Sequence, residues 1–145
     1  MTQPRAIDTL LARYADSHRN PTNELIHFVC IPLIVFTLLG ILWVIAPAAA
    51  LAACLAALVY YFRLSRPFAL GMLLISAVML GVLATMPPYT VLPLSIAIFV
   101  LAWIGQFIGH KIEGRKPSFF DDLRFLLIGP LFVLGFLYRR LHLAY

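Results

Sequence analysis

The sequence predicts an all-α integral membrane protein, and three observations support this. Of its 145 residues, 63% are hydrophobic and 12% are charged, about half the charged fraction of a soluble domain. The mean hydropathy is +0.96. The charged residues are clustered, which leaves three long stretches without any: 28–62, 67–110 and 125–138. Because a helix needs about 20 apolar residues to cross a bilayer, we expect a single membrane domain over residues 1–145.

The basic residues are placed for membrane anchoring. The net charge is +5, which by itself would also be compatible with nucleic-acid binding. However, the arginines and lysines flank the apolar stretches, as expected for residues that anchor and orient a membrane protein. We therefore expect this chain to contact membrane lipid and not to bind nucleic acid. Both cysteines lie inside predicted spans, where a thiol behaves as a small hydrophobic group.

The first predicted element is a short amphipathic helix over 4–16. Its apolar residues recur at the spacing i, i+3, i+4, i+7, with charged residues around the rest of the wheel. Such a helix lies on the membrane surface or on the protein itself. A second helix is expected to start at Asn20-Pro21, because asparagine is a good N-cap and proline suits the first helical position. That helix continues into the first of four predicted spans, at about 28–46, 48–62, 68–86 and 91–109.

The last apolar segment, about 119–138, is either re-entrant or a fifth span. Its uncharged part covers 14 residues, about 21 Å as a helix, and Gly129-Pro130 interrupts it. The loops rich in arginine and lysine should face the cytoplasm, and four spans with both termini cytoplasmic satisfy this pattern. A fifth span would place Arg139 and Arg140 on the opposite side, so we favour a re-entrant segment. The membrane would be the bacterial inner membrane, or the endoplasmic reticulum in a eukaryote.

A polar stripe closes the fourth predicted span. Gln106 and His110 are four residues apart and His110 and Glu113 are three apart, so all three project from one face of a helix. Gly105 and Gly109 have a small-xxx-small spacing, which lets a neighbouring helix come close. An amide, an imidazole and a carboxylate at the end of an apolar helix need a polar partner from another segment.

Histidines from a second segment can supply that partner. The predicted topology brings His18 and His27, which precede the first span, to the same membrane boundary as His110. Neutral imidazoles with one carboxylate suit Fe(II), Zn(II) or another first-row divalent metal. The candidate metal ligands are His18, His27, His110 and Glu113. The candidate residues that orient these ligands are Asn20, Asn23 and Gln106.

Two alternatives stay open for the histidines. Single histidines at a membrane boundary commonly hydrogen-bond to water or lipid headgroups, and His142 is assigned to that class. In addition, a helix that starts at Asn20 places His27 roughly 10 Å along its axis from His18. Both can bind one metal only if the chain before Asn20 folds back. Otherwise one of them serves the substrate.

Two segments resemble the membrane-bound 2-hydroxy fatty acid dioxygenase family, which includes a fungal enzyme of phytosphingosine breakdown and bacterial relatives. The first is HRNPTNELIH, from His18 to His27, and the second is WIGQFIGH, from Trp103 to His110, followed by Glu113. The resemblance implies an Fe(II)-dependent α-oxidation, in which a 2-hydroxy fatty acid and O₂ yield an acid one carbon shorter.

The resemblance also implies which residues act. His18, His27 and His110 match the histidine positions of the family and would be its catalytic metal ligands. Glu113 lies one residue nearer to the histidine than the glutamate of fungal members. The acyl chain of the substrate would lie among the spans, with its acid head at the cytoplasmic boundary.

Three other classes of function fit the sequence less well. A small transporter usually has an ionisable residue in the middle of a span, and none is present in the predicted spans. A membrane scaffold whose histidines bind no metal is the other alternative. A histidine-cluster hydroxylase is less expected, since its closely spaced histidine boxes are absent from the sequence.

Overall fold

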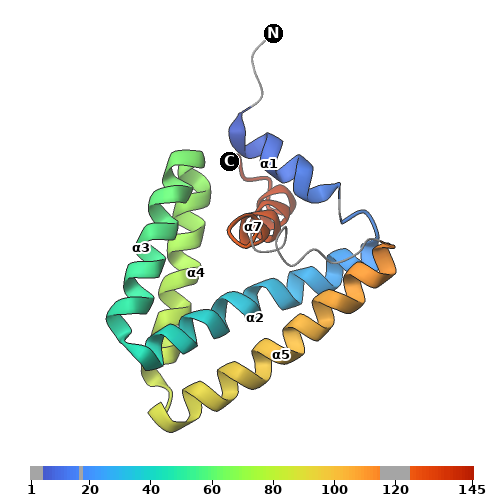
Figure 1. The fold of residues 1–145 in the computed structure, drawn as a ribbon. Coiled ribbons are helices and arrows are strands. Elements are labelled where there is room, and N and C mark those ends of the chain that lie inside the picture. The colour runs from blue at the N-terminus through green and yellow to red at the C-terminus, as the bar shows by residue number, and fades with distance from the viewer. Residues whose placement is uncertain (1–4, 17, 115–124) are drawn as a thin grey trace.

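The structure, a computed structural model, describes residues 5–16, 18–114 and 125–145 (Figure 1). Over these residues it is all-helical, without strands. The helices are α1 (Ala6–Ala15), α2 (Pro21–Ile45), α3 (Pro47–Leu64), α4 (Arg66–Thr85), α5 (Pro88–Glu113) and α7 (Ile128–Arg140). Helices α2 to α5 are long and apolar enough to cross a membrane. This confirms the predicted fold class with four spans. Positions 119–124 of the predicted last segment lie outside the described residues.

The helix boundaries follow from local chemistry. All four long helices have a proline in their first turn, at Pro21, Pro47, Pro67 and Pro88, where its missing N–H leaves no bond unmade. The side chain of Asn20 caps α2 by accepting a hydrogen bond from the backbone N–H of Thr22 at 2.9 Å. Helix α5 ends at Gly114, whose φ of 74° is the left-handed conformation that glycine adopts readily. The start of α2 is therefore where the sequence predicted it.

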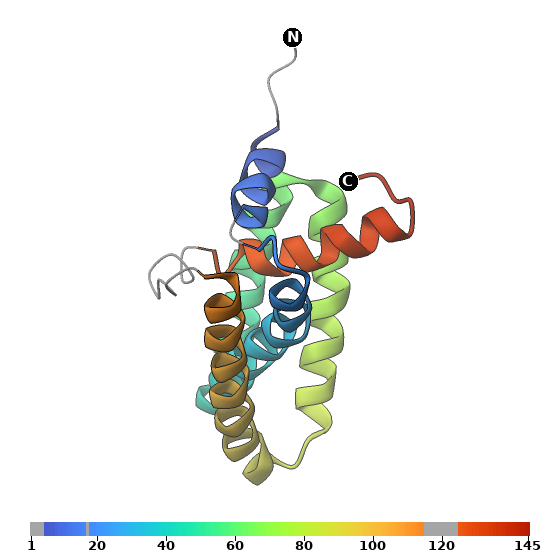
Figure 2. The same cartoon turned by 90° about the vertical axis from the view of Figure 1, so that its right-hand side faces the viewer.

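The long helices form two antiparallel pairs. Helices α2 and α5 lie side by side, and α3 pairs with α4 (Figures 1 and 2). The α2–α3 and α4–α5 turns, which carry no charge, lie at one end of the bundle (Figure 1). The start of α2, the end of α5 and the basic α3–α4 turn lie towards the other end. The charge pattern predicted this grouping. That the basic end faces the cytoplasm stays a prediction.

Glycines on α2 and α5 let these two helices come close. A Cβ added to Gly105 would lie 2.7 Å from Sγ of Cys30, closer than real contacts allow. A Cβ added to Gly109 would collide with the side-chain oxygen of Asn23, and one added to Gly40 would collide with Ser95. The close approach predicted from Gly105 and Gly109 is confirmed, and the neighbouring helix is α2.

We therefore expect Gly109→Ala to destabilise the protein. The added methyl group pushes against Asn23, and overpacking of this kind typically costs about 1–3 kcal/mol. The matched control is Gly81→Ala on α4, because a Cβ there would meet no atom of the described structure within 4 Å. An exposed helical Gly→Ala change is neutral or stabilising by up to about 1 kcal/mol. Thermal unfolding in detergent, followed by circular dichroism, measures both. Equal melting temperatures for the two variants would contradict the expectation.

Helices α1 and α7 pack on each other near the polar end of the bundle. The apolar face of α1, formed by Ile7, Leu11 and Tyr14, is buried in the same cluster as Leu131 and Phe132 of α7. Helix α1 thus lies on the protein, one of the two positions predicted for it. Helix α7 has 13 residues and lies across the long helices (Figure 2), and it is shorter than the roughly 20 residues that a span requires. Its re-entrant position in a membrane stays a prediction.

Candidate metal centre

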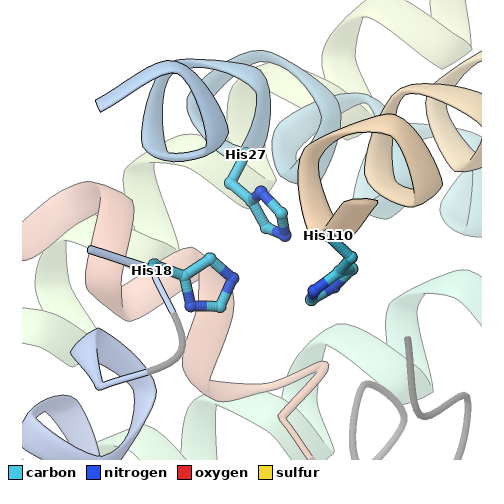
Figure 3. A group of neighbouring side chains, drawn as sticks. All are labelled: His18, His27 and His110. Atoms are coloured by element: carbon cyan, nitrogen blue, oxygen red, sulfur yellow. The ribbon is translucent and has the colours of Figure 1, made fainter. Parts of the chain in front are cut away.

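Three histidines from three segments converge at the polar end of the bundle. His27 belongs to α2, His110 to the last turns of α5, and His18 to the link between α1 and α2. One nitrogen from each ring lies within 4.8 Å of the other two, and the rings face one another (Figure 3). The side chains are 7%, 2% and 5% exposed for His18, His27 and His110. The structure thus brings together three of the four predicted metal ligands.

The link between α1 and α2 explains how two nearby histidines reach one site. Helix α1 ends at Ala15 and α2 begins at Pro21, so His18 does not extend the axis of α2. The ring centroids of His18 and His27 are 4.2 Å apart. The chain before Asn20 therefore folds back, which was the condition for both histidines to share one site.

Backbone carbonyls set the tautomers of two of the rings. Nδ1 of His18 lies 2.7 Å from the carbonyl oxygen of Tyr14, and Nδ1 of His27 lies 2.9 Å from that of Asn23. A carbonyl oxygen only accepts hydrogen bonds, so each Nδ1 carries a proton. In the neutral ring, Nε2 then has the lone pair that binds a metal, and metal-binding histidines commonly have this arrangement.

Tyr14 supports His18 in a second way. Its ring stacks on the imidazole, with centroids 4.2 Å apart and planes within 8°. The ring of Phe132 on α7 packs against that of Tyr14, with centroids 5.0 Å apart. Helix α7 therefore supports the stacked pair of Tyr14 and His18. From the sequence, Tyr14 is expected only as one of the apolar residues of the helix predicted over 4–16. Its spacing of four residues from His18 was the available signal.

Glu113 is engaged away from the three histidines. Its Oε1 accepts a hydrogen bond from the backbone N–H of Arg19, and its Oε2 accepts from the backbone N–H of Asn20 and from Nδ2 of Asn23, each at 3.0 Å. The carboxylate of α5 thus binds the N-terminal end of α2, where the helix dipole favours a negative charge. The predicted fourth ligand therefore ties together the segments that carry His18, His27 and His110.

The residues predicted to support the ligands have distinct positions. Asn23 is fully buried and links Glu113 to the backbone carbonyl that orients His27. Asn20 caps α2. Gln106 is 5% exposed, and its Nε2 has no hydrogen-bond partner among the described residues. Together with His27 it lines a cavity of about 40 Å³, which exceeds the roughly 10–15 Å³ that one water molecule needs, so a small polar group can enter it.

Arg19, a basic residue close to the site, is held on the surface. Its guanidinium donates a hydrogen bond to the carboxylate of Asp16 at 2.7 Å. This hydrogen bond and the opposite charge of Asp16 raise the pKa of Arg19. His142 lies exposed in the tail after α7, away from the three histidines.

The donor set fits a transition metal. Three imidazole nitrogens suit Zn, Cu, Fe or Ni, whereas Mg and Ca prefer oxygen ligands. Three protein ligands also leave coordination positions for a substrate, as in catalytic metal sites.

Comparison with known proteins relates the chain to one family. The model of the Mpo1-like family, described as 2-hydroxy-palmitic acid dioxygenase Mpo1-like, matches residues 5–141. A relative from Saccharomyces cerevisiae, named 2-hydroxy-palmitic acid dioxygenase MPO1, is 32% identical over 132 residues, which cover 86% of this chain and 75% of the relative. No solved structure matches significantly. The range 5–141 spans every described helix and contains the positions of all three histidines. The family model and the yeast relative together show that the chain belongs to the Mpo1-like family.

Proposed function

We propose that this protein is an Fe(II)-dependent dioxygenase that shortens 2-hydroxy fatty acids by one carbon. The observation that carries the proposal is the convergence of His18, His27 and His110 within 4.8 Å in a buried site. Further support comes from the name of the yeast relative, a 2-hydroxy-palmitic acid dioxygenase. Glu113 is not among the proposed ligands, because its carboxylate lies outside the group of three histidines and binds the start of α2.

The reaction balances without an external reductant. A 2-hydroxy acid, R–CH(OH)–COOH, and O₂ would give R–COOH, CO₂ and water. The bond between the carboxyl carbon and the hydroxyl-bearing carbon breaks, and the substrate loses four electrons. One molecule of O₂ accepts these four electrons. The acid and O₂ are therefore sufficient substrates for the proposed α-oxidation.

Each residue of the site has a role in this proposal. His18, His27 and His110 hold Fe(II), which when bound supplies Lewis acidity and one-electron chemistry toward O₂. The carbonyls of Tyr14 and Asn23 keep two of the rings in the metal-binding tautomer. Burial excludes water and strengthens the electrostatic interactions inside the site.

We assign the acid head of the substrate to Gln106. Its buried Nε2 can donate a hydrogen bond, and it lines the same small cavity as His27. The acid would reach this cavity from the bilayer, with its chain among the apolar helices. We propose that the site faces the cytoplasm, because the α3–α4 turn and the end of α5 lie towards this end of the bundle (Figure 1). These two segments carry Arg63, Arg66 and Lys111, and basic residues favour the cytoplasmic side. Depending on the host, the membrane would be the bacterial inner membrane or the endoplasmic reticulum.

Metal and product analysis tests the proposal. The full chain is purified without a histidine tag, loaded anaerobically with Fe(II), and supplied with 2-hydroxypalmitate. We expect stoichiometric iron, uptake of one O₂ per acid consumed, and pentadecanoate as the product. Acid labelled with ¹³C at the carboxyl carbon should release the label as CO₂. Palmitate, which lacks the hydroxyl group, is the matched control and should not be consumed.

Two results would count against this function. The first is the absence of O₂ uptake by protein that contains stoichiometric iron. The second is an equal rate when Zn(II), which has no redox chemistry, replaces Fe(II).

A further inference from the structure

An apolar groove lies beside the histidine site. Its main cavity measures about 340 Å³ and lies between α2, α3 and α4, within the usual range of ligand pockets of roughly 300–1,000 Å³. A second cavity of about 250 Å³, between α2, α4 and α7, is lined entirely by apolar residues. The two cavities share Val35, Met72 and Pro130. The two cavities therefore lie next to each other, and we call them together the acyl groove.

The acyl groove abuts the proposed metal centre. Leu126 lines both the large cavity and the small cavity that contains His27 and Gln106. Along α2, Ile34 borders the small cavity, and Leu38 and Leu42 border the large one, each one turn further from the site. His27 and Leu42 are 15 residues apart, which is about 22 Å along the helix.

The length and chemistry of the groove fit one acyl chain with a small head. A chain of one leaflet extends over roughly 15 Å, half of the hydrocarbon thickness. The walls of the groove are almost wholly apolar, and its end nearest the histidines adjoins a cavity of about 40 Å³ beside His27. A carboxylate with an adjacent hydroxyl group is small enough for such an end, whereas a phospholipid headgroup is far larger.

We propose that the acyl groove binds the chain of the 2-hydroxy acid and that Ala53 limits the length of this chain. The proposal rests on the proposed function for the identity of the head. Helix α3 runs antiparallel to α2, so its groove residues follow the order Tyr61, Ala57, Ala53 with increasing distance from the histidines. Ala53 is the deepest of these, and its small side chain leaves room for the end of a long chain.

Substitution at Ala53 tests the proposal, because its effect on kcat/KM should depend on the chain length of the substrate. Ala53→Phe fills the far part of the groove, and exclusion of even one methylene can cost about 10-fold or more. We expect kcat/KM for 2-hydroxypalmitate to fall by at least about 10-fold, while that for 2-hydroxyoctanoate stays at the wild-type value. The control, Ala52→Phe, adds the same ring at the neighbouring exposed position and should change neither value. An equal loss for both acids, or an equal effect of Ala52→Phe, would overturn the proposal.

Photocrosslinking tests the groove without turnover. The probe is 2-hydroxypalmitate with a diazirine at the end of its chain, bound to the full chain in nanodiscs. We expect crosslinks to the groove faces of α2 and α3 around Leu42 and Ala53, lost in the presence of excess unlabelled acid. Label mainly on lipid-facing residues such as Ala52, or displacement only by phospholipid, would overturn the proposal. Displaceable crosslinks in the groove, combined with no turnover of any acid, would support the groove while refuting the proposed function.

Discussion

Replacing His110 by alanine is expected to abolish both metal binding and O₂ uptake. His110 is the only proposed ligand on α5, and its loss would leave two imidazoles from one end of α2 and the preceding link. Loss of a residue that merely orients a ligand costs about 10–100-fold in metal affinity, and we expect loss of the ligand to exceed that. Iron content after anaerobic reconstitution and O₂ uptake with 2-hydroxypalmitate measure the two effects.

The fourth histidine provides the matched control. His142 is exposed in the tail and has a φ of 55°, a backbone conformation that asparagine tolerates better than alanine. His142→Asn should therefore retain wild-type iron content and turnover. If His110→Ala turned over the acid at the normal rate, the proposed role of His110 would be wrong. If both variants lost iron equally, the effect would not be specific to the three-histidine site.

Glu113→Gln is expected to weaken metal binding about 10–100-fold, as for other residues that orient ligands. Both carboxylate oxygens face N–H donors from Arg19, Asn20 and Asn23. The substitution removes the negative charge and turns one acceptor into an NH₂ group that faces a donor. Hydrogen bonds to charged groups contribute about 1.5–3 kcal/mol, so we also expect a lower melting temperature. Metal titration and thermal unfolding measure the two effects.

Cobalt spectroscopy shows whether Glu113 binds the metal or acts as a clamp, that is, a residue that holds α2 against α5 without touching the metal. If Glu113 holds α2 against α5 without touching the metal, the Co(II)-loaded variant should show the same visible absorption spectrum as the Co(II)-loaded wild type. A shifted spectrum would identify Glu113 as a ligand and contradict its assignment as a clamp. The control is Lys111→Gln, an exposed position two residues earlier on α5, which should change neither the affinity nor the spectrum.

Local patterns were sufficient to predict most of the fold. Long uncharged stretches identify four spans, because the thickness of the bilayer sets how many consecutive apolar residues a crossing helix needs, and such a run is visible in the sequence. Asn20 and Pro21 mark the start of α2 through capping chemistry that involves only neighbouring residues. Gly105 and Gly109 predict a close helix neighbour for the same reason, since a missing Cβ creates space whatever the partner is.

The site required more than local patterns. The positive-inside rule predicted that His18 and His27 lie at the same end of the bundle as His110. It could not predict that their rings would meet within a few ångströms. Glu113 has a carboxylate, which can bind a metal, and it lies three residues after His110 on the same helix face. The sequence pattern therefore favoured it as a metal ligand. Its contacts with the start of α2 depend on how α2 and α5 are aligned along their axes, which spacing does not specify.

The sequence by itself determined the all-helical membrane class, the four spans and the glycine contact face of α5. It also identified the three histidines as candidate metal ligands. Each of these depends on the composition or spacing of one segment. Only the tertiary structure decided that the chain folds back between α1 and α2, that Tyr14 stacks on His18, and that Glu113 binds the start of α2. His18 and His110 are 92 residues apart, and their meeting depends on helix packing and on the turn after Ala15. Contacts between distant segments arise from the fold as a whole, so no single segment encodes them.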